Sequence, residues 1–561
     1  MRKWQIIGKA PDTRIPMSDD DIQSLLLKHR GIKSKKEVAQ FLHPPDPYDL
    51  TAADVAIAAG SLKKAMSRIA KAIKTKESVV VYADYDADGI TAGAIMWETL
   101  HALGANVMPY IPHRVEEGYG LSTLGLENIQ KQYHPTLVVT VDHGITAHDK
   151  VVYARKLGMD VIVTDHHVKP KKLPECTIVH TTGMSGAGVS WFLAKELWKA
   201  GDMRNTPKEK EEMIALAAIG TIADMVPLVG ANRSIVKYGL SALNTTNRIG
   251  LQALMSDAGL VKGNIGTFDV SHVLSPRLNA MGRLVHAIDA LRLLCTRQQD
   301  KAIALAKKLG ITNKERQQLT METTAHALKM IEEKGQNTKE TKLLFISSDS
   351  YNPGVIGLVA GKLVEEYYRP AVVVAAGKAV SKASARSIAG FDIVAAIRLC
   401  SDILVDVGGH PMAAGFTVET KHLGKLKERL EHIAQEALDE NKLTRTLKID
   451  LEIPFQQITM SLWQVLRTFE PYGFGNPQPV FATNGVTLMD ARLVGLGNKH
   501  IRIKLEAAHL PFPLDAIAFG MGDMYSRIRP GDSVDIAYTL DRDSWNGNDK
   551  LQLKVKDIHT S

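Results

Sequence analysis

At 561 residues the chain is too long for a single hydrophobic core, and a prior of about 150 residues per domain predicts three or four domains. Its 45% hydrophobic and 23% charged fractions are those of an ordinary globular protein, and its formal net charge of +8 favours a polyanionic partner only weakly. Three scattered cysteines, and the lack of any apolar run of about 18 residues, exclude a disulfide-stabilised or membrane-spanning protein and predict a cytoplasmic one.

The first 160 residues change from an irregular start to a regular alternation of elements. Residues 1–50 end in Leu-His-Pro-Pro-Asp-Pro, which predicts an irregular arm. Beyond it, apolar runs and helical spacing alternate. Strands are expected at 79–83, 106–111, 136–141 and 160–164, with helices at 90–103 and near 148–157. This alternation favours a doubly wound parallel sheet in an α/β protein, which binds ligands beyond the carboxyl ends of its strands.

Acidic residues and histidines follow these elements directly, at four places in the chain: Asp84, Asp86 and Asp88; Asp142 and His143; Asp165, His166 and His167; and Asp224, after a helix expected at 208–219. Carboxylates packed this closely repel one another, so the pattern favours bound cations, and hard oxygen ligands suit Mg²⁺ or Mn²⁺. For each place taken by itself, the alternative to a metal ligand is a residue that caps a helix or a hydrogen-bonded group of the core. Four such places at one sheet edge favour a metal site that hydrolyses phosphoesters.

The motifs are also similar to those of a known family. Four of them, in this order, resemble the motifs of the DHH phosphoesterase superfamily: Asp-Tyr-Asp-Ala-Asp-Gly at 84–89, Val-Asp-His-Gly at 141–144, Asp-His-His at 165–167 and Thr-Ile-Ala-Asp at 221–224. Three more resemble its RecJ-type single-strand-specific exonucleases: Ser-Pro-Arg-Leu-Asn-Ala-Met-Gly-Arg at 275–283, Ala-Arg-Ser-Ile at 385–388 and Gly-Gly-His-Pro-Met-Ala-Ala-Gly at 408–415. The resemblance covers most of the chain beyond the arm.

This resemblance implies roles for particular residues. It implies two Mn²⁺ or Mg²⁺ ions, whose ligands would be Asp84, Asp86, Asp88, Asp142, His166 and Asp224. With Asp142 and His166, His167 would form the catalytic group, contacting the scissile phosphate or supporting catalysis. Substrate contacts would come from two sets: Arg114, Ser384 and Arg386 around a 5′-terminal phosphate, and Arg277, Asn279, Arg283, Gly409 and His410 along the cleft. A contact that joins the two lobes is the alternative for Arg283.

The chain departs from the family pattern in one place. After the Asp-His-His motif the family usually has a longer loop that contains Asn-Pro, whereas here Val-His-Thr-Thr-Gly at 179–183 runs quickly to Gly186. We expect this shorter loop to reshape one wall of the cleft without removing any predicted metal ligand.

The expected domain organisation has five parts: an arm at 1–50, a DHH phosphoesterase domain at 51–295, a connecting helix at 296–340, a second α/β lobe (DHHA1) at 341–440 and a small β-barrel at 445–561. The barrel is predicted from several short strands, and beside these domains an oligonucleotide-binding OB fold is the best interpretation. His500, Arg502 and Lys504 alternate along one strand, so they share a face suited to a nucleic-acid backbone.

Together these features predict a metal-dependent 5′-to-3′ exonuclease that degrades single-stranded DNA to nucleoside 5′-monophosphates, in DNA repair and recombination as the resemblance implies. Single-stranded DNA with a 5′ end is the expected partner of a monomer that binds no membrane, and a single-strand-binding protein or a helicase is a candidate further partner. A phosphodiesterase on short oligoribonucleotides or cyclic dinucleotides is one alternative, although it has no need of an OB module. The other is a non-catalytic nucleic-acid scaffold, which would be expected to lack metal ligands.

Overall fold

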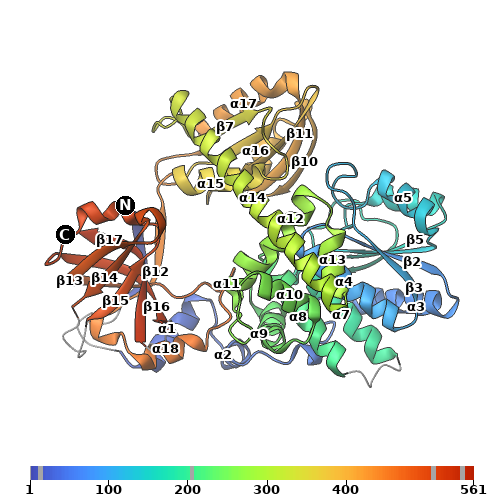
Figure 1. The fold of residues 1–561 in the computed structure, drawn as a ribbon, viewed down its shortest axis with the longest axis horizontal. Coiled ribbons are helices and arrows are strands. Elements are labelled where there is room, and N and C mark those ends of the chain that lie inside the picture. Colours follow the sequence, from blue (N-terminus) through green and yellow to red (C-terminus); the bar gives the residue numbers. More distant parts are fainter. Residues whose placement is uncertain (1, 10–16, 202–206, 507–512, 544–549, 561) are drawn as a thin grey trace. The chain divides into compact units, whose positions relative to one another are not determined.

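The computed structural model describes residues 2–9, 17–201, 207–506, 513–543 and 550–560 (Figure 1). The chain divides into two compact units, each formed from separate stretches. Unit 1 comprises residues 1–112, 117–275 and 446–561, and unit 2 comprises residues 113–116 and 276–445. Within the described ranges no helix has both the length and the apolar character needed to cross a membrane.

A five-stranded parallel sheet lies at the centre of unit 1, with the strand order β3-β2-β4-β5-β6. Its strands are β2 (Ser78–Ala83), β3 (Asn106–Tyr110), β4 (Leu137–Val141), β5 (Asp160–Asp165) and β6 (Thr177–His180). In chain order this is the doubly wound arrangement 2-1-3-4-5, so the predicted fold class is confirmed. The order reverses between β2 and β4, which is where ligands bind in such sheets.

Helices cover both faces of this sheet because its strands are apolar on both sides. Val80 and Val138 lie on one face in a core shared with α5 and α6, while α4 and α7 pack on the other face. The helices of this region are α3 (Ala59–Lys74), α4 (Ala87–Ala102), α5 (Thr123–Tyr133), α6 (His148–Lys156), α7 (Gly186–Ala200), α8 (Pro207–Ala223), α9 (Gly230–Thr245), α10 (Ile249–Asp257), α11 (Thr267–Asp269) and a π-helix (Val270–Leu274).

The expectation of an irregular arm at residues 1–50 is wrong. This stretch forms β1 (Lys3–Lys9), α1 (Asp19–His29) and α2 (Lys35–Leu42). Ser18 caps α1, and Ser34 forms a capping box with Glu37 at the start of α2, so local sequence signals for both helices exist. Strand β1 pairs in parallel with β12 (Thr446–Glu452), which lies far from it in the sequence.

The carboxyl-terminal part of unit 1 is a closed barrel, which confirms the predicted OB fold. Its strands are β13 (Phe481–Val494), β14 (His500–Leu505), β15 (Leu514–Ala518), β16 (Ser533–Asp543) and β17 (Lys550–Thr560). They pair in the order β13-β14-β15-β17-β16, and β16 pairs again with β13 and so closes the ring. Helix α18 (Met460–Arg467) precedes the barrel and packs against α1.

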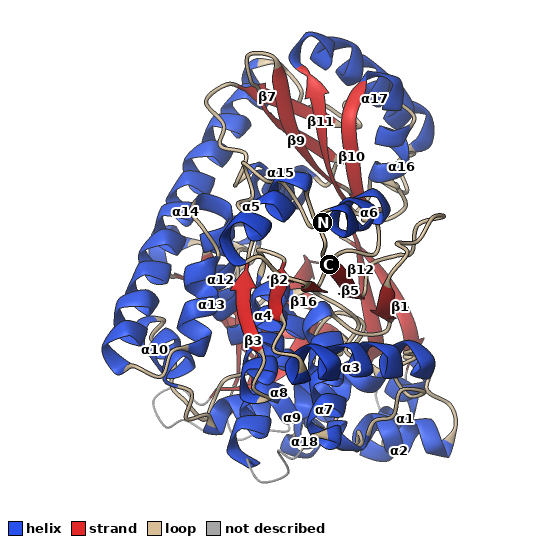
Figure 2. Cartoon of the chain, turned by 90° about the vertical axis from the view of Figure 1, so that its right-hand side faces the viewer, coloured by secondary structure: helices blue, strands red, loops and turns tan. Residues whose placement is uncertain are grey.

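Unit 2 is a five-stranded sheet with helices on both faces (Figure 2). Its strands, in the order β10-β11-β9-β8-β7, are β7 (Leu344–Ser348), β8 (Ala371–Ala375), β9 (Val380–Arg386), β10 (Leu404–His410) and β11 (Ala413–Glu419). Helices α14 (Gln299–Glu333) and α15 (Ile356–Tyr367) share a core with one face, and α16 (Ile393–Arg398) and α17 (Leu423–Ala437) share a core with the other. The predicted long helix is α14, which is preceded by α12 (Ser275–Leu284) and α13 (Ile288–Cys295).

Candidate metal centre

Two aspartates lie at the point where the strand order of the unit 1 sheet reverses. Asp84 follows β2 and Asp142 follows β4, and these two strands are neighbours in the sheet. Both side chains are almost fully buried. Asp142 has a φ of +67°, in the left-handed region that non-glycine residues seldom adopt, and its backbone N–H donates to the carbonyl of Thr164 at 3.0 Å. Such strain persists only where the surrounding structure enforces it, and it is common at active and ligand-binding sites.

The other two carboxylates of the first motif bind the starts of two helices. Asp86 is the N-cap of α4, and its Oδ1 accepts hydrogen bonds from the backbone of Asp88 and Gly89, each at 3.0 Å. Asp88 accepts from the backbone N–H groups of Gly186 and Ala187 at 2.7 and 2.9 Å, at the start of α7. The capping alternative therefore holds for Asp86, but it does not account for Asp84 or Asp142.

His166 brings three of these carboxylates together. Its Nε2 atom lies 3.1 Å from Asp142 Oδ1, 3.6 Å from Asp224 Oδ2 and 3.9 Å from Asp88 Oδ2. Asp224 reaches this position because α8 ends one residue before it, and its N–H donates to the carbonyl of Gly220 at 2.9 Å. All four sequence motifs of the predicted metal site thus converge.

Three overlapping groups of potential ligand atoms result, with the atoms of each group within 4.8 Å of one another: Asp84, Asp86 and Asp142; Asp88, His166 and Asp224; and Asp142, His166 and His167. Asp142 and His166 each belong to two groups. A carboxylate shared in this way suits a pair of neighbouring divalent cations.

The charges in the cluster are strongly unfavourable without cations. Burial, and then repulsion from the neighbouring carboxylates, raises the pKa of Asp142 well above its usual value. Burial and Asp86 raise the pKa of Asp88 to about 6, and burial and Asp88 raise the pKa of Asp224 to about 9. Within the described residues, the buried Asp142 Oδ1 and Asp224 Oδ2 atoms accept no hydrogen bond. These residues fit Mn²⁺ or Mg²⁺, because oxygen-rich sites with neutral imidazole suit such cations.

Three glycines allow the cluster to close. A Cβ atom on Gly186 would lie 2.3 Å from Asp142 Oδ1, and one on Gly220 would lie 2.5 Å from Asp88 Oδ1. A Cβ atom on Gly89 would lie 2.6 Å from the backbone oxygen of Asp84. Because these distances are too short for any side chain, α4, α7 and α8 approach the carboxylates at positions that only glycine can fill. The short connection between β6 and α7 leads directly to Gly186.

The sequence did not single out the partners that hold His167. Asp165 Oδ1 accepts from His167 Nδ1 at 2.8 Å and from the backbone of His166 at 2.6 Å, while its Oδ2 accepts from Ile145 at 2.8 Å. On the other side of the ring, Tyr119 Oη lies 3.2 Å from His167 Nε2. Asp165 belongs to the Asp-His-His motif, so the motif was a signal, but its role depends on where the carboxylate points.

The pKa values of His167 and His143 are shifted in opposite directions because the surroundings of the two rings differ. Burial lowers the pKa of His167, but the hydrogen bond and charge of Asp165 outweigh that effect and leave the pKa raised. Burial lowers the pKa of His143 to about 4. His143 Nε2 donates to the carbonyl of Tyr82 at 3.0 Å, so this histidine is a neutral core group.

In unit 2, the residues predicted to hold a 5′-terminal phosphate lie together. Burial, and then the positive charge of Arg114, lowers the pKa of the Arg386 guanidinium. Arg386 Nη1 donates to Ser384 Oγ at 3.3 Å, and a Cβ atom on Gly357, in the first turn of α15, would lie 2.9 Å from that oxygen. Two guanidinium groups, a hydroxyl and a helix N-terminus therefore converge, a combination suited to binding an anion.

The predicted cleft residues of unit 2 lie on two elements. Arg277, Asn279 and Arg283 are partly buried on α12, and Arg283 Nη1 donates to the carbonyl of Gly354 at 3.2 Å, so it joins α12 to the turn before α15. His410 ends the edge strand β10 and is exposed. Gly409 has a φ of +143°, and a Cβ atom there would lie 2.3 Å from the carbonyl oxygen of Ala413.

On the barrel, the predicted shared face of β14 is present. His500, Arg502 and Lys504 alternate with the buried residues Ile501 and Ile503. Arg502 Nη2 lies 3.3 Å from Asp515 Oδ1, and His500 Nδ1 accepts a hydrogen bond from Gly520 N at 2.9 Å. Part of the positive charge of this face is therefore already paired.

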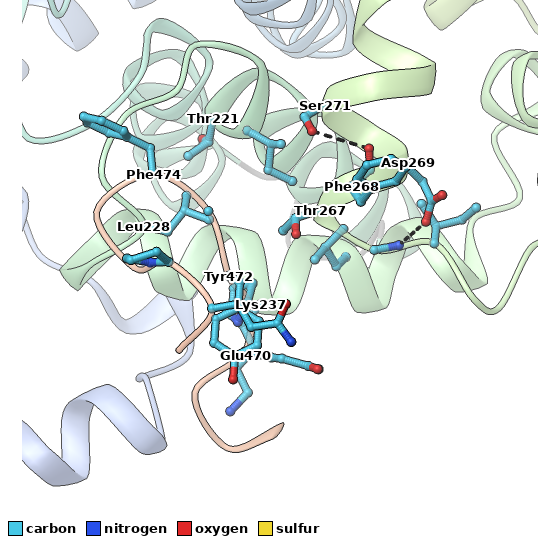
Figure 3. A pocket seen from close by; sticks show the side chains of 18 of the residues that line it. Thr221, Leu228, Lys237, Thr267, Phe268, Asp269, Ser271, Glu470, Tyr472 and Phe474 are labelled. Carbon is cyan, nitrogen blue, oxygen red and sulfur yellow. Dashed lines mark hydrogen bonds between the residues drawn. The ribbon is translucent and has the colours of Figure 1, made fainter. Parts of the chain in front are cut away.

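A groove of about 1260 Å³ in unit 1 is lined in part by Ala223 and Met225, the residues on either side of Asp224 (Figure 3). One wall is the end of α8 and the loop after it, including Thr221 and Met225. Phe268, on α11, is 66% exposed there and stacks on His272 with ring centroids 4.3 Å apart. The facing wall is the segment before the barrel, which contributes Phe474. Sequence periodicity could not reveal this groove, because its walls come from distant parts of the chain.

Three family models match the chain, each over one part of it. The model described as the DHH family, N-terminal domain, matches residues 78–221, the DHHA1 domain matches residues 340–437, and the RecJ OB domain matches residues 449–557.

Relatives match over almost the whole chain. The single-stranded-DNA-specific exonuclease RecJ of Bacillus subtilis is 35% identical over 557 residues, which cover 96% of this chain and 68% of that protein. The protein of the same name from Escherichia coli is 30% identical, with 95% of each chain covered. The crystal structure of RecJ from Thermus thermophilus in complex with Mn²⁺ superposes with a TM-score of 0.82 at 30% identity, covering 100% of this chain and 80% of that one.

Proposed function

The chain belongs to the RecJ family of single-stranded-DNA-specific exonucleases, and from this premise we propose that it hydrolyses single-stranded DNA from a 5′ end to nucleoside 5′-monophosphates. The observation that carries the proposal is the cluster of aspartates and histidines at the point where the order of the parallel strands reverses. The matches span the second lobe and the barrel as well as this cluster, which favours a long polymeric substrate over a dinucleotide. The intact ligand set disfavours a non-catalytic scaffold.

The proposed metal ligands are Asp84, Asp86, Asp88, Asp142, His166 and Asp224, which would hold two Mn²⁺ or Mg²⁺ ions. When bound, these ions supply positive charge that polarises the scissile phosphate and lowers the pKa of the attacking water. The sharing of Asp142 and His166 between ligand groups supports a paired site. Two RecJ structures from Thermus thermophilus, one in complex with Mn²⁺ and one with Mg²⁺, support this choice of ions.

His167 is proposed to donate a hydrogen bond to the scissile phosphate, and with Asp142 and His166 it completes the catalytic group. The raised pKa of His167 supports this role, because it favours the protonated imidazole, which carries a hydrogen on both ring nitrogens. Asp165 accepts a hydrogen bond from His167 Nδ1 and so orients the ring.

Polarity is proposed to come from unit 2. Arg114, Ser384 and Arg386 would bind the 5′-terminal phosphate. Arg277, Asn279, Arg283, Gly409 and His410 are proposed to line the substrate cleft, and His500, Arg502 and Lys504 to contact the DNA backbone.

We also propose the wider setting of the enzyme. The domain boundaries 51–295, 341–440 and 445–561 are supported by the three family models, which match residues 78–221, 340–437 and 449–557. Burial raises the pKa values of the Cys176 and Cys400 thiols, which makes these thiols unreactive. We propose that the enzyme is cytoplasmic and acts in DNA repair and recombination. We propose that it acts as a monomer, with a single-strand-binding protein or a helicase as partner.

The assigned metal roles are tested by replacing Asp142 and His166 singly with alanine. We expect hydrolysis of 5′-phosphorylated single-stranded DNA to be abolished and DNA binding to be largely kept, because binding also uses the phosphate pocket and the barrel. Asp149→Ala, which removes an exposed carboxylate on α6, is the control and should change neither. Equal loss of binding and hydrolysis would contradict these roles.

The proposed phosphate pocket is tested by Arg386→Ala. The variant should lose preference for 5′-phosphorylated over 5′-hydroxyl ends, measured as the ratio of kcat/KM values for the two substrates. Arg398→Ala, an exposed arginine on α16 of the same unit, should keep the preference. An unchanged ratio in Arg386→Ala would remove this residue from the pocket.

A further inference from the structure

Arg233, on α9, uses all five of its guanidinium hydrogens on backbone carbonyls. Its side chain is 1% exposed. The five acceptors are the carbonyl oxygens of Phe41 at 2.7 Å, Glu470 at 2.8 Å, Phe469 at 2.9 Å, Thr468 at 3.3 Å and Pro471 at 3.4 Å. A guanidinium has no more donors than these, so the site is saturated.

The carbonyl groups that hold Arg233 follow or end two helices. Phe41 lies in the last turn of α2, and residues 468–471 directly follow α18. The carboxyl ends of helices carry partial negative charge, which stabilises a buried cation. The guanidinium carbon also lies 4.0 Å from the ring centroid of Phe41. Arg233 thereby ties the amino-terminal α2 and the segment before the barrel to one helix of the phosphoesterase domain.

This helix is packed tightly on the helix that ends at the metal centre. A Cβ atom on Gly239 of α9 would lie 2.4 Å from Ala218 Cβ and 2.5 Å from the carbonyl oxygen of Ile214, both on α8. Helix α8 ends at Ala223, next to Asp224. Segment 468–474, which Arg233 holds at its start, lines the groove opposite the end of α8 through Thr468 and residues 470–474 (Figure 3). Leu228 N donates to the carbonyl of Phe474 at 2.7 Å.

We propose that Arg233 is a positioning residue that fixes segment 468–474 against α8 and α9, and so sets the affinity for DNA that extends from the metal centre into the groove. The inference rests on the proposed function. Because Arg233 contacts only protein groups in its hydrogen bonds, it acts through that wall of the groove and leaves the hydrolytic groups in place.

The kinetic test compares Arg233→Lys and Arg233→Met with the wild-type protein. Lysine keeps the charge but replaces five donors in a planar fork with three on a tetrahedral amine. We expect KM for a single strand of about 30 nucleotides to rise roughly tenfold in Arg233→Met and less in Arg233→Lys, with kcat within about twofold of wild type. For a strand of about 5 nucleotides, too short to extend from the metal centre along the groove, both constants should stay within about twofold.

Controls and a second readout separate this inference from the proposed function. Arg292→Met, which removes a surface arginine that is 65% exposed, should behave as wild type. Asn476→Ala removes the amide that donates to the carbonyls of Phe469 and Pro471, so it should reproduce the pattern of Arg233→Met even if that variant fails to fold. Hydrogen exchange of residues 466–478 should accelerate in Arg233→Met, while β2 and β4 stay protected.

Unchanged exchange at 466–478, or an equal rise in KM for both strand lengths, would overturn the role of Arg233. Loss of kcat with unchanged KM would do the same. A wild-type protein that cleaves no DNA would overturn the proposed function, and the exchange measurement would still decide whether Arg233 positions the segment.

Discussion

Single residues at the metal centre are held in conformations that favour the site over local stability. A left-handed backbone costs a non-glycine residue about 1 kcal/mol or more, yet Asp142 adopts it and thereby reaches His166. Asp88 gives both carboxylate oxygens to the start of α7, which fixes that helix beside the cluster. The geometry therefore depends as much on the backbone around the ligands as on the ligands themselves.

Gly186→Ala tests this dependence. The added methyl group would meet Asp142 Oδ1 at 2.3 Å, so α7 or the carboxylate must move. We expect affinity for Mn²⁺ to fall by about 10- to 100-fold, as for other changes that displace metal ligands, measured by titration calorimetry. The matched control is Gly361→Ala in α15, where an added Cβ meets nothing within 4 Å. Equal affinity in the two variants would contradict the proposed crowding.

The carboxylates also determine how pH affects the stability of the metal-free protein. Burial and mutual repulsion raise the folded-state pKa of Asp142, Asp88 and Asp224 above the ordinary value of 3.8. The folded state then holds more protons than the unfolded state, so the free energy of unfolding falls as pH rises from about 4 through about 9. Bound cations offset the repulsion.

The difference in Tm between Mn²⁺-loaded and chelator-treated protein should therefore widen between about pH 5 and about pH 8. Thermal unfolding at several pH values measures it. A difference that stays constant or narrows with rising pH would show that the carboxylates do not repel one another in the folded chain.

At the scale of elements, local signals in the sequence were sufficient to predict a strand and its part in the site where acidic residues directly follow that strand. The apolar runs before Asp84 and Asp142 predict both the strands and the edge at which their carboxylates meet. The pairing of β1 with β12 could not be predicted in this way, because the two strands are far apart in the sequence and β1 has only seven residues. The role of Asp165 was equally hidden, since only the direction of its carboxylate separates an orienting group from a ligand.

Strand β1 should stabilise the barrel, because it joins the same sheet through β12 and its Trp4 contacts β17. Trp4 Nε1 donates to Asp557 Oδ2 at 2.9 Å, and its ring stacks on His559 with centroids 4.2 Å apart. We expect Trp4→Ala to destabilise the barrel by about 1–3 kcal/mol, because the variant loses packing and leaves Asp557 without this donor. Faster hydrogen exchange of β17 would report this change.

The matched control on the same strand is Ile7→Ala, because Ile7 is 50% exposed. It should alter stability by no more than about 0.5 kcal/mol. Comparable acceleration of β17 exchange in the two variants would mean that the contribution of β1 does not come from the Trp4 contacts.

At the scale of the molecule, the chain combines a metal centre in unit 1, an anion-binding cluster in unit 2 and a barrel whose segment before β13 is fastened to α9 by Arg233. The sequence predicted the three modules because each has its own periodicity and motifs. It could not predict the contact of Arg233 with the segment before β13, since a buried arginine that binds only carbonyl groups has no local sequence pattern.

Together these parts are proposed to form a metal-dependent exonuclease that starts at a 5′ end. The most direct measurement uses a 5′-phosphorylated single strand of about 30 nucleotides with a label at its 3′ end, incubated with Mn²⁺ or with chelator beside its duplex. We expect a ladder that shortens from the 5′ end, only with Mn²⁺ and only on the single strand. An intact strand in the presence of Mn²⁺, or immediate release of the label as a mononucleotide, would contradict it.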